Sequence, residues 1–491
     1  YAGFLGRDVP ISTVCEVRDR AATILRDAGY IAAVQVPEQR IENGIIHFQV
    51  LMARLTSVRV RGEATGAQTV LAAYLNQLTR RPLFNRFEAE RYLLLASDLP
   101  GYTVRLTLRP AGTGPGEVIG DVTVQRLPAY VDFIVQNGGS HQLGPWGGLL
   151  RGQLFGLTGL GDRTLLSVFS TSDFHEQQTV QVGHDMRIGP EGLSLGGTFT
   201  YAWARPSVEG AHVLAKTMLT TVELGYPLVR RQQTTVRASA GLDVVNQNVW
   251  FNRAALTHDR LRVGFLRLGV DAVPADIGTS FSNVEPPWRL TSLLELRQGM
   301  HALGATRDCG PAGVNCLSQG QVPPSRLEGR SDATVLRFTG YGEARPVPKL
   351  TVALGARAQY AWQPLLSFEY FSAGNYTVGR GYDPGALLGD SGFGTQAEVR
   401  YGSRIPVSLS KPAVEGYGFW DHADVSHHDG AILVTQRNHL NSVGAGARAN
   451  WNRFAIDAAV AVPLTHLGPL NRKPPVRFLV SLTSRLWPWK Y

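Results

Sequence analysis

The sequence predicts an all-β transmembrane barrel of about sixteen strands, preceded by two small α/β units. From about residue 129 onward, apolar and polar residues alternate with period two in about sixteen segments. Glycine, at 54 of 491 residues, is frequent, and charged residues, at 18%, are scarce. Residues 1–128 instead combine helical spacing with short strands. No apolar run approaches the ~18 residues of a membrane helix, which excludes helical spans.

The first unit, residues 1–55, is predicted to hold one helix followed by two strands. The segment 11–30 places apolar residues at helical spacing, and Gly29 then ends the helix as a cap. Residues 31–41 and 44–55 are predicted strands. Because a preceding helix and strand are missing, we interpret this unit as partial and expect the native chain to extend upstream. Cys15 lies on the helix without an evident partner, and we expect a buried free thiol.

The second unit, residues 56–128, is predicted to follow the order β-α-α-β-β. Two helical patterns stand between strand patterns that are rich in Val, Leu and Thr. We expect the apolar residues of both helices to pack against the unit's own sheet. The five segments in order are 55–62, 67–78, 85–99, 102–112 and 116–126.

The third unit, residues 129–491, carries the barrel pattern. In "TVRASAGLDVV" (235–245) the residues from Val236 to Val244 alternate with Arg237 and Asp243. A soluble sandwich also alternates, but its core does not tolerate such charges unpaired at mid-strand. The strands are also long, and several end in aromatic residues, as membrane girdles do. These aromatic residues are Tyr201, Trp203, Tyr360, Trp362 and Trp451.

Two segments resemble an outer-membrane translocase superfamily whose barrels follow POTRA domains. "YTVGRGYDPGALLGDSGFGTQAEVRY" (376–401) resembles the sixth extracellular loop, with its V/I-R-G-Y/F signature at residues 379–382. Gly379 replaces the usual aliphatic residue, although Val378 stands beside it. "YGFWDHADV" (417–425) resembles a Phe-x-Asp-x-Gly strand motif in which Ala423 replaces the glycine.

The amino-terminal units resemble POTRA domains, and residues 29–55 are similar to the first POTRA of two-partner secretion transporters. The matching positions are Gly29, Tyr30, Pro37, Gln39 and Gly44. This resemblance implies a monomeric, non-enzymatic transporter in the bacterial outer membrane, with its POTRA domains in the periplasm. It implies export, without ATP, of a secreted partner exoprotein that carries an N-terminal secretion domain. The exoprotein would be an adhesin, a haemolysin or a contact-dependent toxin. Outer-membrane lipid is expected as a further partner, and nucleic acid and cofactors are not.

The resemblance also implies that the sixth loop folds into the barrel lumen with Arg380 at its tip. Glycine at 379 and 381 permits the backbone to approach the wall closely. The guanidinium of Arg380 is a planar fork that suits a carboxylate. Asp421 is the first expected partner and Glu398 the second, and Gly381, Tyr382 and Val378 complete the motif.

Two other functions stay open from the sequence. A membrane-protein insertase of the same superfamily also combines POTRA domains with a barrel, but it has more POTRA domains and opens sideways between its first and last strands. A passive pore for small solutes needs no periplasmic docking arm, so the α/β units argue against it. A scattered net charge of +9 fits a basic interior or an anionic membrane surface better than a nucleic-acid site.

Four further features of the sequence bear on function. Cys309 and Cys316 share a short Gly/Pro-rich loop, which predicts a local disulfide and an oxidising compartment. "GDSG" (389–392) lacks the next glycine and the His/Asp context of a serine protease. No Gly-Lys dipeptide exists, so a P-loop is absent. In "DHADVSHHDG" a metal site is not expected, because we predict divergent side chains at His422, Asp424, His427, His428 and Asp429.

Overall fold

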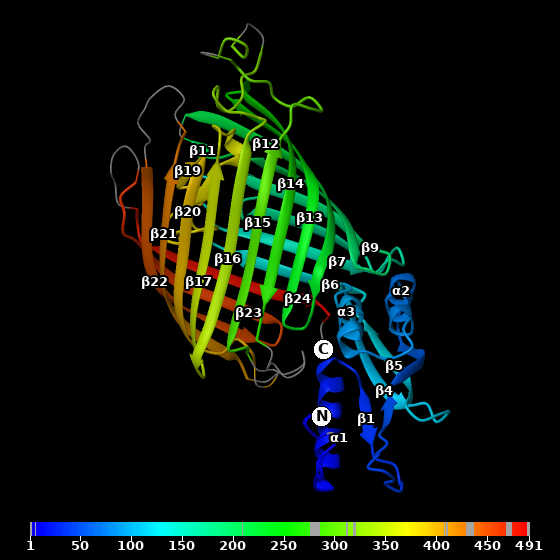
Figure 1. Ribbon diagram of the computed structural model, residues 1–491. Coiled ribbons are helices and arrows are strands. Elements are labelled where there is room, and N and C mark those ends of the chain that lie inside the picture. Colours follow the sequence, from blue (N-terminus) through cyan, green and yellow to red (C-terminus); the bar gives the residue numbers. More distant parts are fainter. Residues whose placement is uncertain are drawn as a thin grey trace.

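The chain forms a large β-barrel with two small α/β units below one end (Figure 1). Among the described residues, none of the helices is both long and apolar enough to cross a membrane. The computed structural model describes every residue except 1, 5, 209, 275–284, 311–312, 318–320, 407, 409–410, 429–436, 468–473 and 489–491.

The first α/β unit consists of α1 (Ser12–Asp27), preceded by the short 3-10 helix η1 (Ala2–Phe4), and the strand pair β1 (Ala32–Gln35) and β2 (Gln49–Met52). Helix α1 ends as predicted, because Gly29 adopts a φ of +88° and its N–H returns to the carbonyl of Arg26. The expectation of a buried Cys15 is wrong. Its thiol is free but exposed, since a two-stranded sheet leaves α1 without a buried residue.

The second α/β unit has the predicted order, with its two helices packed on one face of a three-stranded sheet. Strand β5 lies centrally, parallel to β3 and antiparallel to β4. Tyr74 and Val122 are almost fully buried in its core, which confirms that the helices cover their own sheet. Asn85 caps the second helix by accepting from the N–H of Phe87. The elements are β3 (Arg54–Gly62), α2 (Gln68–Leu78), α3 (Arg86–Ser97), β4 (Tyr102–Pro110) and β5 (Glu117–Arg126).

The barrel is closed, and sixteen long antiparallel strands of the described chain form its wall. A seventeenth strand, β11 (Ser207–Val208), pairs with the first residues of β12. The circle closes where β24 pairs with β6. The wall strands are β6 (Ala129–Gln136), β7 (Gly147–Phe155), β8 (Arg163–Thr171), β9 (Gln177–Ile188), β10 (Leu193–Ala204), β12 (Ala211–Arg230), β13 (Thr234–Phe251), β14 (Ala254–Ala272), β15 (Trp288–Gly299), β16 (Thr334–Val347), β17 (Leu350–Ala361), β20 (Ser391–Gly402), β21 (Ala413–Ser426), β22 (Arg437–Trp451), β23 (Phe454–Pro463) and β24 (Arg477–Trp487).

Alternate residues of the wall point in and out, as the period of two predicts. On β17, Val352 and Leu354 are 47% and 54% exposed on the outer face, whereas Thr351 and Ala353, which alternate with them, are 2% and 3% exposed. On β13, Asp243 and Thr235 are buried on the inner face. An apolar outer face and a polar inner face are what a barrel wall in a lipid bilayer requires.

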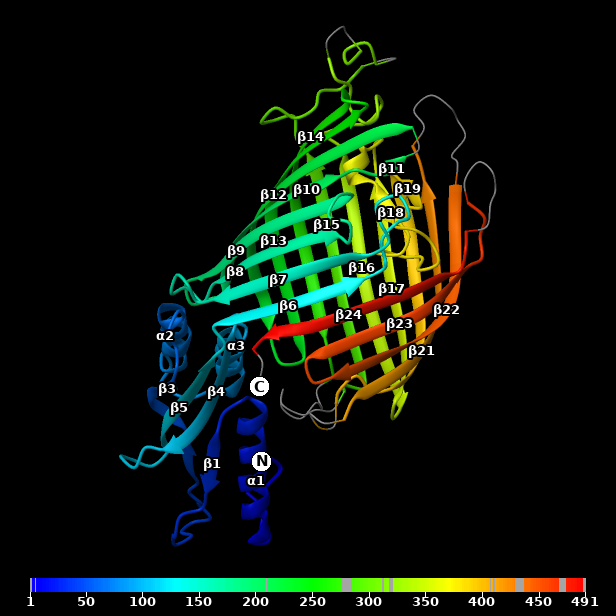
Figure 2. The same cartoon turned by 180° about the vertical axis from the view of Figure 1, so that it is seen from behind.

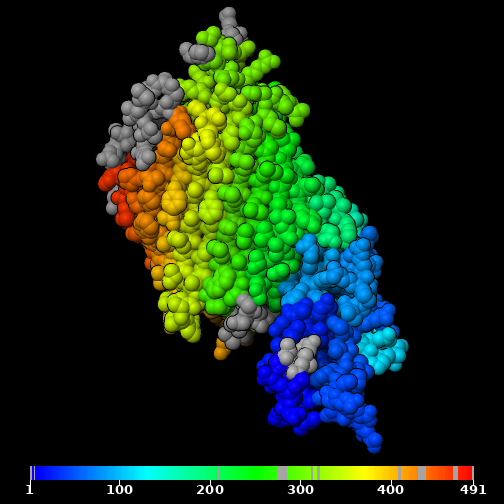
Figure 3. Space-filling view, viewed as in Figure 1, coloured from blue at the N-terminus to red at the C-terminus, as the bar shows by residue number. Residues whose placement is uncertain are grey.

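The second α/β unit is docked against one mouth of the barrel, where the two surfaces meet directly (Figure 3). Asp98, after α3, receives a bidentate pair of hydrogen bonds from Arg230 of β12, at 2.6 and 2.8 Å. Tyr92 of α3 donates to Glu191 in the β9–β10 turn, at 3.0 Å. The chain enters β6 from this side, and the opposite mouth carries the two longest connections, which follow β15 and β17 (Figure 2).

Candidate functional site

Loop 6, residues 362–390, connects β17 to β20 and folds into the barrel. It contains a short 3-10 helix, η3 (Ser367–Glu369), and a hairpin of β18 (Phe371–Ala373) with β19 (Leu387–Gly389). Gly379 has a φ of +116°, and a Cβ there would lie 2.6 Å from Leu440. A Cβ on Gly381 would lie 2.8 Å from the Cβ of Ser442. Glycine at these positions therefore allows the loop tip to approach the wall.

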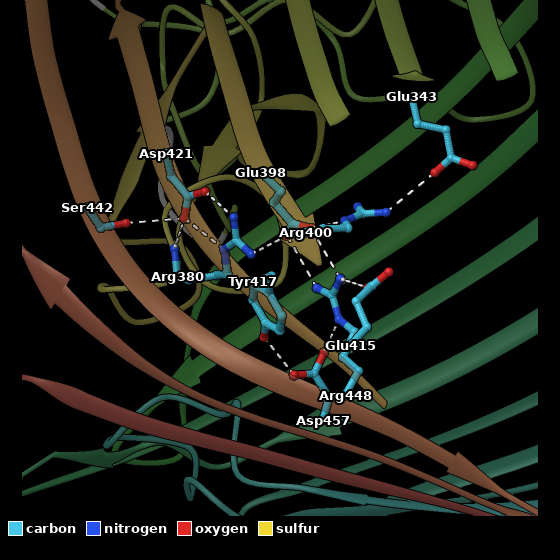
Figure 4. A network of polar contacts seen from close by, with 10 residues as sticks. All are labelled: Glu343, Arg380, Glu398, Arg400, Glu415, Tyr417, Asp421, Ser442, Arg448 and Asp457. Atoms are coloured by element: carbon cyan, nitrogen blue, oxygen red, sulfur yellow. Dashed lines mark hydrogen bonds and ion pairs between the residues drawn. The ribbon is translucent and has the colours of Figure 1, made fainter. Parts of the chain in front are cut away.

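Arg380 lies at this tip and contacts both carboxylates that the sequence analysis proposed as partners (Figure 4). Its Nη2 is 2.6 Å from Asp421 Oδ1, its Nε is 3.1 Å from Asp421 Oδ2, and its Nη1 is 2.5 Å from Glu398 Oε1. Its backbone N–H donates to the same aspartate at 2.8 Å. The guanidinium also lies 3.6 Å from the ring centroid of Phe419. Two carboxylates and one aromatic ring thus fix the position of the Arg380 guanidinium.

The partners of Arg380 belong to a wider charged network on the inner wall (Figure 4). Glu398 of β20 also accepts from Arg448 of β22 and from Arg400. Arg448 continues to Asp457 of β23 at 2.8 Å. Each charged side chain in this cluster has a neighbour of opposite charge. The cluster can therefore be buried at a lower desolvation cost than the same charges would have without partners.

The remaining motif residues pack beside this network. The Val378 and Tyr382 side chains are 2% and 1% exposed, in an apolar cluster with Leu440 and Ala423. The methyl of Ala423 therefore packs in this cluster, where the family pattern has glycine. Tyr382 Oη accepts from the N–H of Thr465 at 2.8 Å and lies within donating distance of two carbonyls. Val378 fills an apolar position next to Gly379, whose backbone must turn.

Loop 6 has a second ionic anchor that was not predicted from the sequence. Glu369 on η3 is 5% exposed and pairs with Arg297 of β15 at 2.8 Å and with Arg337 of β16 at 2.7 Å. Ser367, two residues before it, donates to Gln247 of β13 at 3.2 Å. The loop therefore crosses the lumen, from contacts with β13–β16 to contacts with β20–β22. In the sequence, the one indication of this anchor is that Glu369 is a single acidic residue within the apolar stretch "LLSFEYF".

A third contact of loop 6 lies at the closure between the first and last strands. Asp383 pairs with Arg477 at the start of β24 and with His141 in the loop after β6, 2.9 Å away. Arg477 also donates to the carbonyl of Gly139 in that loop. Both edges of the closure are thus tied to loop 6 at the mouth opposite the α/β units.

The other candidate residues from the sequence lie elsewhere. Cys309 and Cys316 are joined by a disulfide in the loop between β15 and β16. Asp390 of the "GDSG" stretch is fully buried and pairs with Arg326, at 2.9 Å. Asp429 lies outside the described residues, and the described His, Cys, Asp and Glu side chains form no group that would hold a metal ion.

A cavity of about 650 Å³ lies where the second α/β unit meets the barrel. Its lining joins Tyr74 and Asp98 of this unit to Arg187, Glu223 and Arg267 of the inner wall. The cavity is therefore polar, carries both signs of charge, and connects the docked unit with the inner face of the barrel.

Residues 119–449, more than half of the chain, match the family model of the haemolysin secretion/activation proteins ShlB/FhaC/HecB. The chain belongs to this family. It is a bacterial outer-membrane transporter of the two-partner secretion type, and its partner is a secreted exoprotein. The family's role is transport rather than catalysis. No curated protein sequence matches the chain.

Solved structures share the fold of this family member. CdiB from Escherichia coli superposes with a TM-score of 0.78 at 15% identity, covering 99% of this chain and 86% of the other. CdiB from Acinetobacter baumannii gives 0.68 at 17% identity, with 98% and 83% covered. BamA from Haemophilus ducreyi lacking POTRA domains 1–3 gives 0.56 at 13% identity, with 98% and 95% covered. At these identities the likeness concerns the fold, and the α/β elements are compatible with POTRA domains.

Proposed function

We propose that the α/β units, as periplasmic POTRA domains with boundaries at residues 1–55 and 56–128, recognise the exoprotein and deliver it unfolded to the barrel of residues 129–491. The observation that carries this proposal is the tethered loop 6, whose Arg380 binds Asp421 and Glu398 inside the lumen. A loop that is held by exchangeable ion pairs can be displaced by a passing chain and can return.

The docked geometry supports a path for that chain. The cavity between the second unit and the barrel is lined by both bodies, so a segment bound below has a polar route to the inner wall. Strand β4 stands at an edge of its sheet, with unpaired backbone groups to which an extended segment can add. The sequence contains no P-loop, so folding of the exported chain outside the cell would supply the direction of transport.

The transporter acts in this proposal as a monomer in outer-membrane lipid, without catalysis, cofactor or nucleic acid. The exported partner is an adhesin, a haemolysin or a contact-dependent toxin that carries an N-terminal secretion domain. Arg380, Gly381, Tyr382 and Val378 form the loop anchor, and Asp421 and Glu398 are its wall partners.

The test is deletion of the gene for this chain, followed by comparison of surface and medium proteins and of the outer-membrane barrel content. We expect one large secreted protein to disappear while other barrels keep their levels. A general loss of barrel proteins would instead support an insertase, to which the BamA-like fold also corresponds. An unchanged set of secreted proteins would reject the proposal. Complementation with the intact gene is the control.

A further inference from the structure

A second pocket lies outside the lumen, where β10 ends, β12 begins and β11 pairs with it. These strand ends lie at the rim of the barrel opposite the α/β units (Figure 2). We call it the rim pocket, and its volume is about 890 Å³. Its lining is rich in basic side chains and contains no acidic one among the described residues. The polar and aromatic lining is His175, Arg205, His212, Lys216, Trp250 and Arg253.

The strand register places the core of this pocket on the outer face of the wall. Thr221 of β12 donates to the inward-facing Asp243, so the odd-numbered residues along this strand point inward. Lys216 and His212 are even-numbered and point outward, on the same face as Val222, which is 51% exposed. Because Ser207 pairs with His212, β11 continues this outer surface above the strand ends.

Aromatic residues flank the lysine at the level of the membrane interface. Trp203 stands opposite Lys216 in the β10–β12 register. The Nζ of Lys216 lies 5.3 Å from the centroid of the Trp250 ring on β13. Outward tryptophans near strand ends mark the interface between hydrocarbon and headgroups. The ammonium therefore lies where headgroup charges are found, and the apolar face of β12 continues below it.

The three cations of the rim pocket are not paired with a carboxylate among the described side chains, and the nearby Glu176 instead accepts from Ser207 Oγ at 2.9 Å. Neither Arg205, Lys216 nor Arg253 forms an ion pair with a described carboxylate, in contrast to Arg380, Arg297 and other arginines of the inner wall. The guanidinium of Arg205 donates only to the carbonyl of His175, at 3.1 Å, among described atoms. The pocket thus presents cations and free donors directly above an apolar surface.

We propose that the rim pocket binds the phosphorylated headgroup of a glycolipid in the outer leaflet of the membrane. Arg205, Lys216 and Arg253 would contact the phosphate, and Trp250 with Leu214 would contact the sugar and the first methylenes. The bound lipid would fix the depth and tilt of the barrel on the side where β10, β12 and β13 meet.

An acidic segment of the exported chain is the other anion that such a pocket would attract. The exported chain passes through the lumen, however, which lies on the opposite face of the wall. The apolar surface below Lys216 would also offer few favourable contacts to a polar peptide. A lipid fits this surface better. Its anionic headgroup would contact the cations of the pocket, and its acyl chains would contact the apolar surface below them.

The test is native mass spectrometry of the full chain in detergent, titrated with bisphosphorylated lipid A and with its dephosphorylated form. We expect the phosphorylated lipid to bind about tenfold or more tightly than the dephosphorylated one, and the double variant Lys216→Gln/Arg205→Gln to lose this preference. Inorganic phosphate in millimolar amounts is expected not to compete.

The matched control is Arg260→Gln/Arg307→Gln, which removes two basic residues from another pocket on the loop side of the barrel. It should bind both lipids like the unchanged protein. Equal binding of the two lipids by the unchanged protein would overturn the proposal, even if the double variant failed to fold. Full competition by inorganic phosphate would overturn the assignment to a lipid. Unaltered lipid preference with reduced export in the double variant would assign the pocket to the exported chain instead.

Discussion

Arg297 of β15 and Glu369 of loop 6 form a bidentate pair inside the barrel, with Nη2 2.8 Å from Oε1 and Nε 3.1 Å from Oε2. Both side chains are almost fully buried. Arg297 on β15 lies four strands along the wall from Asp421 on β21. Loop 6 is therefore held at two separate places on the inner wall, by pairs in which the loop contributes an anion at one place and a cation at the other.

Glu369→Gln should release the first of these ends. The amide keeps the shape but removes the charge that Arg297 and Arg337 share, which we expect to destabilise the local arrangement by about 3 kcal/mol. Hydrogen exchange should rise in residues 364–373, and single-channel conductance should increase. Glu223→Gln is the control, since Glu223 pairs with Arg267 on the wall and not with loop 6. Equal exchange in both variants would contradict an anchoring role.

Arg380→Ala should lower export of the partner while leaving barrel insertion nearly intact. Removing the guanidinium leaves Asp421 buried without its main cation, at a cost of about 3–5 kcal/mol to the loop arrangement. Surface level and heat-modifiable migration check insertion, and the amount of secreted partner checks export. Arg380→Lys should recover part of the export, because a lysine keeps the charge but loses the fork.

Arg151→Ala is the matched control for that experiment. Arg151 forms a bidentate pair with Asp132 on the barrel wall, with Nε 3.0 Å from Oδ1, and neither residue contacts loop 6 among the described interactions. If Arg151→Ala lowered export as much as Arg380→Ala, then breaking any ion pair on the wall would be sufficient to impair export. Normal export by Arg380→Ala at a normal surface level would refute the lumenal anchor.

Asp98→Asn should loosen the docking of the second α/β unit on the barrel. The carboxylate is partly exposed, so we expect the lost pair with Arg230 to cost about 1 kcal/mol or less. Faster hydrogen exchange in α3 and in residues 227–232 would report this change. Glu88→Gln on α3 is the control, because Glu88 pairs with Arg81 within the unit. Exchange that is unchanged at the barrel turn would mean that other contacts dominate the docking.

Acid should loosen the turn between β7 and β8, which lies outside the membrane-spanning strands. Burial by itself raises the pKa of Asp162, but hydrogen bonds from the Thr158 side chain and from the N–H groups of Thr158 and Leu157 outweigh it. The pKa therefore lies below its ordinary value of 3.8. Since the folded pKa is lowered, this stabilisation is present above 3.8 and is lost as the pH falls through the folded value.

Proteolysis of residues 156–162 should therefore be slow at neutral pH and increase only below pH 3.8, with an acid-stable protease. Asp162→Asn should remove this pH dependence, because the amide does not titrate. An unaltered acid response in the variant would assign the effect to other carboxylates.

Much of the fold follows from local pattern. The alternation in residues 235–245 predicted that Arg237 and Asp243 share the polar face of β13, and the helical spacing before Gly29 predicted α1 and its end. The partners of Arg380 came from motif resemblance rather than from spacing, because Asp421 lies 41 residues away along the chain. The buried Cys15 was predicted wrongly, because burial depends on what packs against a helix and not on its own sequence.

The sequence by itself determined the period of each strand, the order of the α/β elements and the glycines that let loop 6 approach the wall. These properties depend on backbone sterics and on which face of a strand is apolar, and both are local. The tertiary structure alone decided that Glu369 meets Arg297, that Asp383 joins the two edges of the barrel closure, and that the rim pocket gathers its cations. Such contacts depend on barrel closure and register, which bring together residues that are distant along the chain.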